Sequence, residues 1–248
     1  MYFVLDIVCV AVVVACIIRF AKGSFWSPLT RVFAVIVSVL LALVVQTFLA
    51  PVIANNLVTP FMEKQAAFEL ADVVGGQHLD TAEETAKNID TSNLEKLIKE
   101  HQTFFEELVD KYNCSVETIE KEYKSSHDAY CVVQKMADPP ALLVSKAVVY
   151  CLALIVCMLL LKLLVIRRIE GNLISTRRTK TIKNIGAPIC GAILGIIIVF
   201  ALTIAVEWFV RALCGVSVLL SKDMITKGLI YPYLRVINPL YMLASIMP

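Results

Sequence analysis

Charged residues are scarce in this sequence of 248 residues, where Asp, Glu, Lys and Arg together make up 18%. Apolar residues make up 58%, whereas soluble domains are about half apolar and about a quarter charged. This balance excludes an ordinary soluble domain and predicts a protein that lies in a lipid bilayer. The charges are also uneven, because residues 51–140 hold 17 acidic and only 8 basic side chains. Such an acidic segment repels phosphate, so nucleic acid is not an expected partner.

The common catalytic motifs are missing from the sequence as well. It has no His-Glu-x-x-His zinc pair, no glycine-rich phosphate loop, and no second acidic residue inside a hydrophobic run that would serve intramembrane proteolysis. We therefore expect no enzyme, no cofactor and no metal ion. The alternative is a zinc site from His101, Cys114, His127 and Cys131, because the last two are four residues apart and share a helix face.

Four hydrophobic runs are long enough to predict membrane-spanning helices, at residues 3–18, 32–50, 141–166 and 186–206. We expect the second run to end at Pro51 and the third to begin after the break Asp138-Pro139-Pro140. A further apolar segment, residues 229–246, contains Arg235, two prolines and three tyrosines. It predicts an interfacial or re-entrant segment, with a fifth span as the alternative.

The predicted fold is an all-α integral membrane protein with four transmembrane helices and a helical extracytoplasmic insert between spans two and three. Its expected parts are residues 1–50 (spans one and two), 51–140 (the acidic insert), 141–210 (spans three and four) and 211–248 (the interfacial or re-entrant end). The two short loops between spans are basic, with Arg19, Lys22 and Arg31 in one and Arg167, Arg168, Arg177, Arg178, Lys180 and Lys183 in the other. Basic loops stay in the cytoplasm, so the insert is predicted to lie outside.

Apolar residues of the acidic insert recur with helical spacing. The predicted helix starts are Thr59-Pro60, the capping-box spacing Ser92 to Glu95, and Ser115, and Gly75-Gly76 ends the first helix. The apolar faces of these helices predict a small helical domain or a helical hairpin lying on the membrane part. The alternative is that they bind an extracytoplasmic protein partner, and the sequence does not separate the two.

Cysteines do not form a disulfide framework, because six of the eight lie in apolar runs. Cys114 and Cys131 are the exceptions, and their predicted location in an oxidising compartment favours a disulfide between them. Along one straight helix roughly 25 Å would separate them. The bond therefore requires a helix break, which we expect near Ser125-Ser126. Two free thiols are the alternative.

Three charged residues, Asp6, Glu207 and Arg211, fall near the outer membrane boundary of this topology. Glu207 and Arg211 are four residues apart on one helix face, and Asp6 is placed to meet Arg211 across helices. One interpretation is the mouth of an ion or solute path. The other is anchoring at the membrane interface beside Trp208.

Ala187, Gly191 and Gly195 form a face of small residues on the fourth predicted span. Such a face lets another helix approach closely. We expect packing within the chain, and contact between copies in a homo-oligomer is the alternative.

Several short motifs follow one another in a definite order along the chain. Asp6 lies in an apolar first helix that ends in the turn Lys22-Gly23-Ser24-Phe25, and the second helix ends at Ala50-Pro51. After the insert follow a long third helix, a basic loop, a fourth helix with Gly186, Gly191 and Gly195, and a tail with Ile230-Tyr231-Pro232. This order is similar to that of the colicin V production protein family, CvpA. Ser24 splits the family's basic-Gly-Phe turn, and the insert is longer than the loop of typical members.

The resemblance implies a protein of the bacterial inner membrane associated with colicin production and envelope physiology, and it implies no known reaction. The leading hypothesis is a non-enzymatic scaffold or assembly factor that supports toxin production or export and envelope homeostasis. The alternative is an oligomeric channel or transporter for an unidentified solute. It ranks second because the predicted spans contain few polar residues, namely Ser38, Gln46, Thr47 and Thr203.

Overall fold

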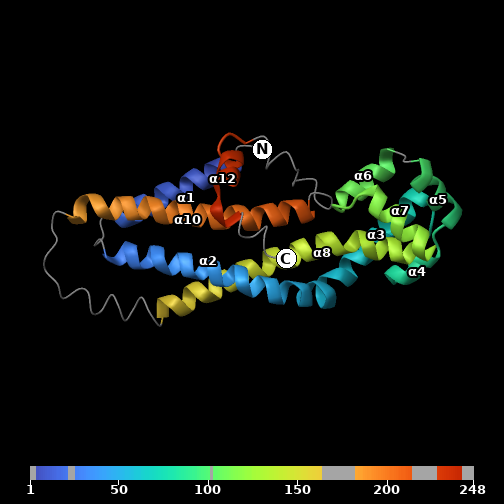
Figure 1. Ribbon diagram of the computed structural model, residues 1–248, viewed down its shortest axis with the longest axis horizontal. Helices are drawn as coiled ribbons and strands as arrows, with labels where there is room; N and C mark the ends of the chain where they lie inside the picture. The colour runs from blue at the N-terminus through green and yellow to red at the C-terminus, as the bar shows by residue number, and fades with distance from the viewer. Residues whose placement is uncertain (1–3, 22–25, 101–102, 164–181, 214–227, 242–248) are drawn as a thin grey trace. The chain divides into compact units, whose positions relative to one another are not determined.

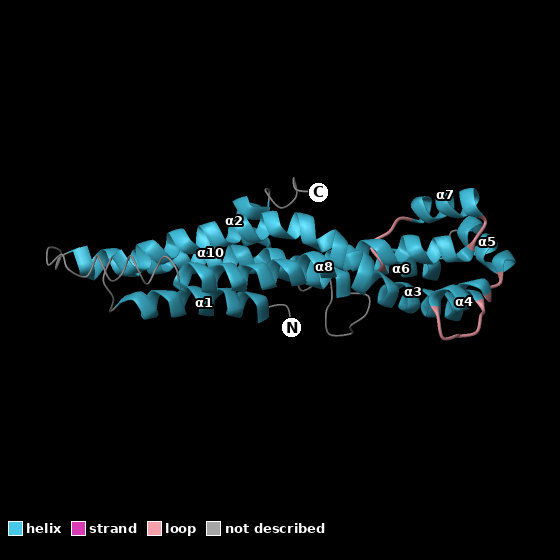
Figure 2. Cartoon of the chain, turned by 90° about the horizontal axis from the view of Figure 1, so that it is seen from below, coloured by secondary structure: helices cyan, strands magenta, loops and turns pink. Residues whose placement is uncertain are grey.

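The computed structural model describes residues 4–21, 26–100, 103–163, 182–213 and 228–241, and these ranges contain helices and no strand (Figures 1 and 2). The chain divides into two compact units. The membrane unit comprises Met1–Phe48, Ala147–Glu207 and Ser221–Pro248, and the insert unit comprises Leu49–Lys146 and Trp208–Leu220. Three helices continue along the chain from one unit into the other.

The membrane unit is built from α1 (Val4–Ala21), α12 (Tyr231–Ile237) and parts of α2 (Trp26–Ile53), α8 (Ala129–Leu161) and α10 (Ile182–Leu213). Within this unit α1 and α8 run opposite to α2 and α10 (Figure 1). The helix ends that flank the two short basic connections therefore lie at the same end of the unit. The prediction that both basic loops lie on the same side of the membrane requires this arrangement.

Three helical segments are long and apolar enough to cross a membrane: Thr30–Val74 with 45 residues, Ala129–Leu161 with 33 and Gly186–Arg211 with 26. They correspond to predicted spans two to four. Helix α1 has 18 residues, a rise of about 27 Å against a hydrocarbon core of about 30 Å. Its role as a span stays a prediction. Large apolar side chains on the outside of the unit, such as Ile7, Phe33 and Leu152, are more than half exposed, as a lipid-facing surface requires.

The second span does not end at Pro51, contrary to the sequence prediction. Helix α2 continues through a π-helical stretch (Ala54–Val58) directly into α3 (Thr59–Val74). A proline keeps φ near −65°, which a helix also uses, so it removes one hydrogen bond without forcing a turn. The side-chain amide of Asn56 donates to the Val52 carbonyl at 2.9 Å, a contact within this continuous helix just after the proline. The end predicted at Gly75-Gly76 for the first helix of the insert is confirmed, because α3 stops at Gly75, whose φ of 90° favours glycine.

The predicted break at Asp138-Pro139-Pro140 is also wrong. Both prolines lie inside α8, which runs without interruption from Ala129 to Leu161. The missing backbone N–H groups leave two carbonyls of the preceding turn, those of Lys135 and Met136, without their usual donors. The thiol of Cys114 lies against both.

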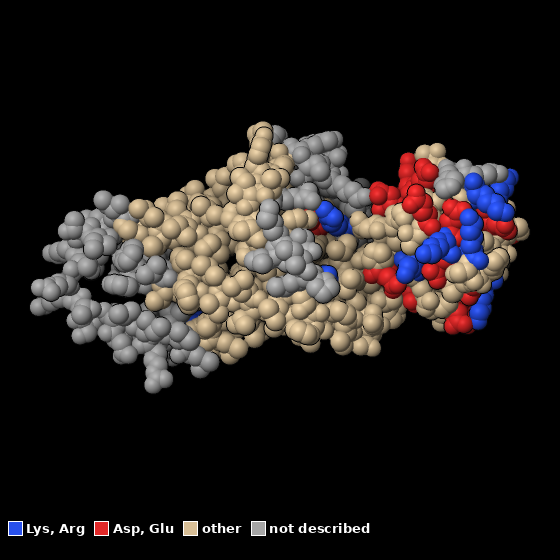
Figure 3. Space-filling view, viewed as in Figure 1, with Lys and Arg blue, Asp and Glu red and all other residues tan. Residues whose placement is uncertain are grey.

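The insert unit has a hydrophobic core of its own. Around it lie α3, α4 (Ala82–Lys87), α5 (Thr91–Glu100), α6 (Thr103–Lys111), α7 (Val116–Ser126) and the first turns of α8. Its largest fully buried side chains are those of Leu70, Leu94, Phe105, Ile119 and Met136. The apolar faces therefore cover one another, which favours the helical-domain interpretation. Charged side chains gather over the outside of these helices (Figure 3).

Of the helix boundaries predicted inside the insert, those at Ser115 and at Ser125-Ser126 are present, and the one at Ser92 is displaced. The Ser115 hydroxyl accepts from the Thr118 backbone N–H at 3.3 Å and begins α7, as expected. The predicted break near Ser125-Ser126 is present, because α7 ends there and His127 takes a left-handed conformation with φ 53°. The helix predicted from Ser92 starts one residue earlier instead, and Asp90 accepts from the Ser92 N–H at 3.0 Å.

Candidate functional site

Asp6 lies in the first turn of α1, and its side chain is buried, with 5% exposed. Its Oδ2 accepts from the backbone N–H of Leu229 at 2.7 Å, and its Oδ1 accepts from those of Ile230 at 3.1 Å and Tyr231 at 2.8 Å. These N–H groups lie at the start of α12. The first N–H groups of a helix have no carbonyl within the helix to which they can donate. Asp6 is therefore the cap of a helix that lies more than two hundred residues further along the chain.

Hydrogen bonds to α10 hold the rest of the C-terminal segment. The Tyr231 hydroxyl donates to the Thr203 carbonyl at 3.0 Å. The Asn238 amide donates to the Thr203 hydroxyl at 2.8 Å and to the Phe200 carbonyl at 2.9 Å. The Tyr241 hydroxyl donates to Oε1 of Glu207 at 3.0 Å, and Glu207 is only 2% exposed. We call these residues the C-terminal anchor: Asp6, Thr203, Glu207, Tyr231, Asn238 and Tyr241.

The three charges singled out in the sequence thus have different surroundings. Asp6 and Glu207 both hold the C-terminal segment within the membrane unit. Arg211 belongs to the insert unit and is exposed, and its backbone carbonyl accepts from the Asn113 amide at 2.7 Å. An ion pair of Arg211 with either acid stays a prediction. The anchor residues that sequence reasoning missed are Tyr231, Asn238 and Tyr241, whose signal is a set of polar side chains within an apolar segment.

The small-residue face of α10 packs against α1. A Cβ added at Gly195 would lie 2.8 Å from the Cα of Val13, and one added at Gly191 would lie 2.9 Å from the Cys16 carbonyl oxygen. Ala187, one turn earlier, is completely buried. The expected packing within the chain is therefore present, and the alternative of a contact between copies loses its main support at this face.

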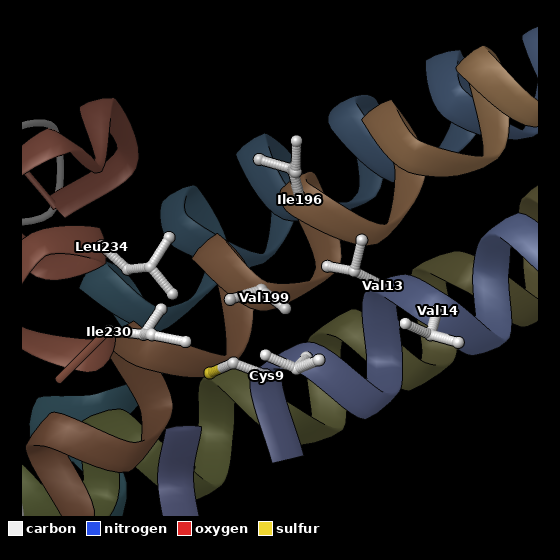
Figure 4. Close-up of a pocket in the computed structure, with 8 residues that line it drawn as sticks. Cys9, Val13, Val14, Ile196, Val199, Ile230 and Leu234 are labelled. Atoms are coloured by element: carbon white, nitrogen blue, oxygen red, sulfur yellow. The ribbon is translucent and has the colours of Figure 1, made fainter. Parts of the chain in front are cut away.

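Two cavities of about 200 Å³ each lie in the membrane unit. The first, shown in Figure 4, is lined by Cys9, Val10, Val13, Val14, Ile196, Val199, Ile230 and Leu234. The second lies between α2, α8 and α10, and Tyr150 is its one lining residue with a hydroxyl. Neither cavity offers the polar lining that a hydrated ion or a polar solute needs.

Two polar side chains of α2 stand apart from the C-terminal anchor. Ser38 and Gln46 are completely buried, and neither the Ser38 hydroxyl nor either polar atom of the Gln46 amide has a hydrogen-bond partner. Buried polar groups are normally bonded to protein or water. Within a spanning helix such groups mark a candidate path or binding position.

The predicted disulfide is not formed, because Cys114 and Cys131 are both free thiols. The Cys114 sulfur lies 3.4 Å from the Lys135 carbonyl, one helical turn beyond Cys131 on α8. It therefore faces the carbonyl freed by Pro139. Burial, and then the nearby charge of Asp138, raise the pKa of the Cys114 thiol to about 11.

Some predicted site residues lie outside the described part of the chain. Lys22 and Gly23 of the family turn are among them, as is His101 of the alternative zinc site. Among the residues that the structure does describe, no three His, Cys, Asp or Glu side chains group closely enough to hold a metal ion. Comparisons with known protein families, with curated proteins and with solved structures find no match to this chain.

Proposed function

We propose that this protein is a non-enzymatic membrane scaffold of the colicin V production type, placed in the bacterial inner membrane. Four spans carry the acidic domain, residues 51–140, on the extracytoplasmic side. There the domain serves as an assembly surface for an envelope protein partner in toxin production or export and in envelope homeostasis.

The observation that carries this proposal is the continuity of helices between the two units. The segment Thr30–Val74 and helix α8 are long enough to cross the membrane and also contribute Leu70 and Met136 to the insert core. A folded domain with a closed core, carried on helices that continue along the chain into the membrane unit, is suited to presenting a surface. The hydrogen bonds of the C-terminal anchor join helices within the chain, which suits a structural role better than transport.

A photo-crosslinking amino acid tests the partner surface directly. Glu117 on α7 is exposed on the insert unit, and Leu152 on α8 is 56% exposed on the membrane unit. We expect a crosslink to protein from position 117 in living cells and crosslinks to lipid from position 152, which serves as the matched control. Lipid adducts alone at both positions would refute the scaffold role of the insert.

A complementation experiment tests the link to toxin production. In a bacterium that secretes a colicin V-type toxin, deletion of this protein should lower the secreted toxin. A variant with charge-reversed exposed residues on α7, such as Glu117→Lys with Lys121→Glu, should restore less toxin than the wild type at equal membrane abundance. Full secretion without the protein would contradict the assignment.

The alternative, an oligomeric channel or transporter, is favoured by one observation, the unbonded amide of Gln46. If it lines a path between copies, purified protein in liposomes should pass ions or small solutes, and Gln46→Leu should reduce that flux. Liposomes without flux, together with a Gln46→Leu variant that is more stable than the wild type, would favour the scaffold.

A further inference from the structure

The turn between α6 and α7, residues 112–115, contacts two other helices of the insert unit. Asn113 has a left-handed backbone with φ 56°, a conformation that asparagine tolerates better than most residues. Its side-chain amide donates to the Arg211 carbonyl of α10 at 2.7 Å. The next residue, Cys114, lies against α8. One tight turn thus reaches two helices that continue into the membrane unit.

The two α8 carbonyls that this turn contacts lack their normal helical donors. Arg211 lies in the last turn of α10, and its carbonyl accepts from the Asn113 amide. On α8, Pro139 and Pro140 have no N–H to give to the carbonyls of Lys135 and Met136. The Cys114 sulfur lies 3.4 Å from the first and 4.0 Å from the second.

The turn itself is held firmly by the insert core. Tyr112, its first residue, is 2% exposed, and Ile119, one turn into α7, is completely buried. The Cys114 backbone N–H donates to the Val109 carbonyl of α6 at 3.1 Å. The positions of the Asn113 amide and the Cys114 thiol therefore depend on an intact insert core.

We propose that the α6–α7 turn is a conformational latch, which fixes the proline-weakened part of α8 and the end of α10 for as long as the insert core is ordered. Pro140 lies six residues before Lys146, the last residue of α8 that belongs to the insert unit. A partner that shifts α6 and α7 would release both helices at this point. The proposal goes beyond the scaffold function and does not depend on the identity of any partner.

Amide hydrogen exchange of the full-length protein in lipid nanodiscs tests the latch. Cys114→Ala removes the thiol, Cys114→Ser keeps a donor, and Cys131→Ala is the matched control, a half-buried cysteine of α8 with no part in the latch. We expect Cys114→Ala to raise exchange in residues 141–146 by about twofold, the lower value for one hydrogen bond, because a thiol is a weak donor. Cys114→Ser and Cys131→Ala should stay near the wild type.

The other half of the latch is tested with Asn113→Asp, which tolerates the same backbone conformation but has no donor for the Arg211 carbonyl. It should raise exchange by a similar factor in residues 209–213 of α10. Unchanged exchange in both helices for the double variant, Asn113→Asp with Cys114→Ala, would overturn the latch. If the double variant loses protection throughout α6 and α7, the single variants decide, and equal exchange of residues 141–146 in Cys114→Ala and Cys114→Ser would overturn the role of the thiol.

Discussion

Replacing Asp6 is expected to release the C-terminal helix α12 from the membrane unit. The carboxylate of this buried residue accepts three backbone hydrogen bonds, from Leu229, Ile230 and Tyr231. Asparagine has nearly the same shape but only one acceptor oxygen. If its oxygen keeps the bonds to Ile230 and Tyr231, its NH2 group meets the N–H of Leu229, and two donors then face each other.

The size of the effect follows from the number of bonds lost. A hydrogen bond to a charged group contributes about 1.5 to 3 kcal/mol net. Asp6→Asn should therefore weaken the docking of α12 by about 10- to 150-fold, since about 1.36 kcal/mol corresponds to a factor of ten. Asp6→Ala removes all three bonds, and even at the lower value for each the loss is about 4.5 kcal/mol, which is more than a thousandfold.

Hydrogen exchange of residues 229–237 in lipid nanodiscs measures the docking equilibrium. We expect exchange to rise in the order wild type, Asp6→Asn, Asp6→Ala, while the α6 and α7 peptides keep their protection. Asp80→Asn, which changes an exposed acid of the insert unit, is the matched control and should leave α12 unaffected. Wild-type protection of α12 in Asp6→Ala would refute the capping role of Asp6.

Three further predictions concern other parts of the chain. Gly195→Leu should lower stability by about 1 to 3 kcal/mol through overpacking against the α1 backbone, and thermal unfolding in detergent checks this, with unchanged stability as the contrary result. A reporter fused after Lys180 should be cytoplasmic and one inserted near Gly76 extracytoplasmic, and the reverse pattern would overturn the orientation. Since the Cys114 pKa is raised from 9.0 to about 11, its thiolate population and its rate of alkylation should keep rising with pH until about pH 11. At pH 8 a maleimide should react about 100-fold more slowly with Cys114 than with the same thiol in the unfolded chain, because each pKa unit changes the thiolate fraction tenfold, and equal rates would contradict the burial of this thiol.

The helical class and three of the four predicted spans follow from hydropathy alone. The runs 32–50 and 186–206 and residues 141–161 of the third run each fall within a helix that is long and apolar enough to cross a membrane. Local capping signals were informative at Ser115 and Gly75, but not at Ser92, where the helix begins earlier and Asp90 bonds the Ser92 N–H. These signals depend on neighbouring residues, so a single sequence contains them.

The C-terminal anchor was only half predictable, because its partners are far apart along the chain. Asp6 and Glu207 stood out as acids at the edges of apolar runs. The partners of Asp6 are backbone N–H groups 223 to 225 residues away, and no spacing rule identifies a backbone group as a partner. The Tyr241 hydroxyl that bonds Glu207 is 34 residues distant, so its role also depends on how the segment folds back.

The two wrong helix ends, at Pro51 and at Pro139-Pro140, share one physical cause. Proline ends a helix in a sequence-based prediction because it removes a donor and its ring crowds the preceding turn. Both effects are local and cost only a few kcal/mol, so a longer helix persists when another group bonds the freed carbonyls and the tertiary structure gains from a continuous helix. At Pro139 the Cys114 thiol, 21 residues before Lys135, supplies such a group. Pro51, Pro139 and Pro140 all lie in the insert unit, within eight residues of a boundary with the membrane unit. At each of these points the helix stays unbroken, so α2 and α8 continue along the chain from the membrane unit into the insert unit.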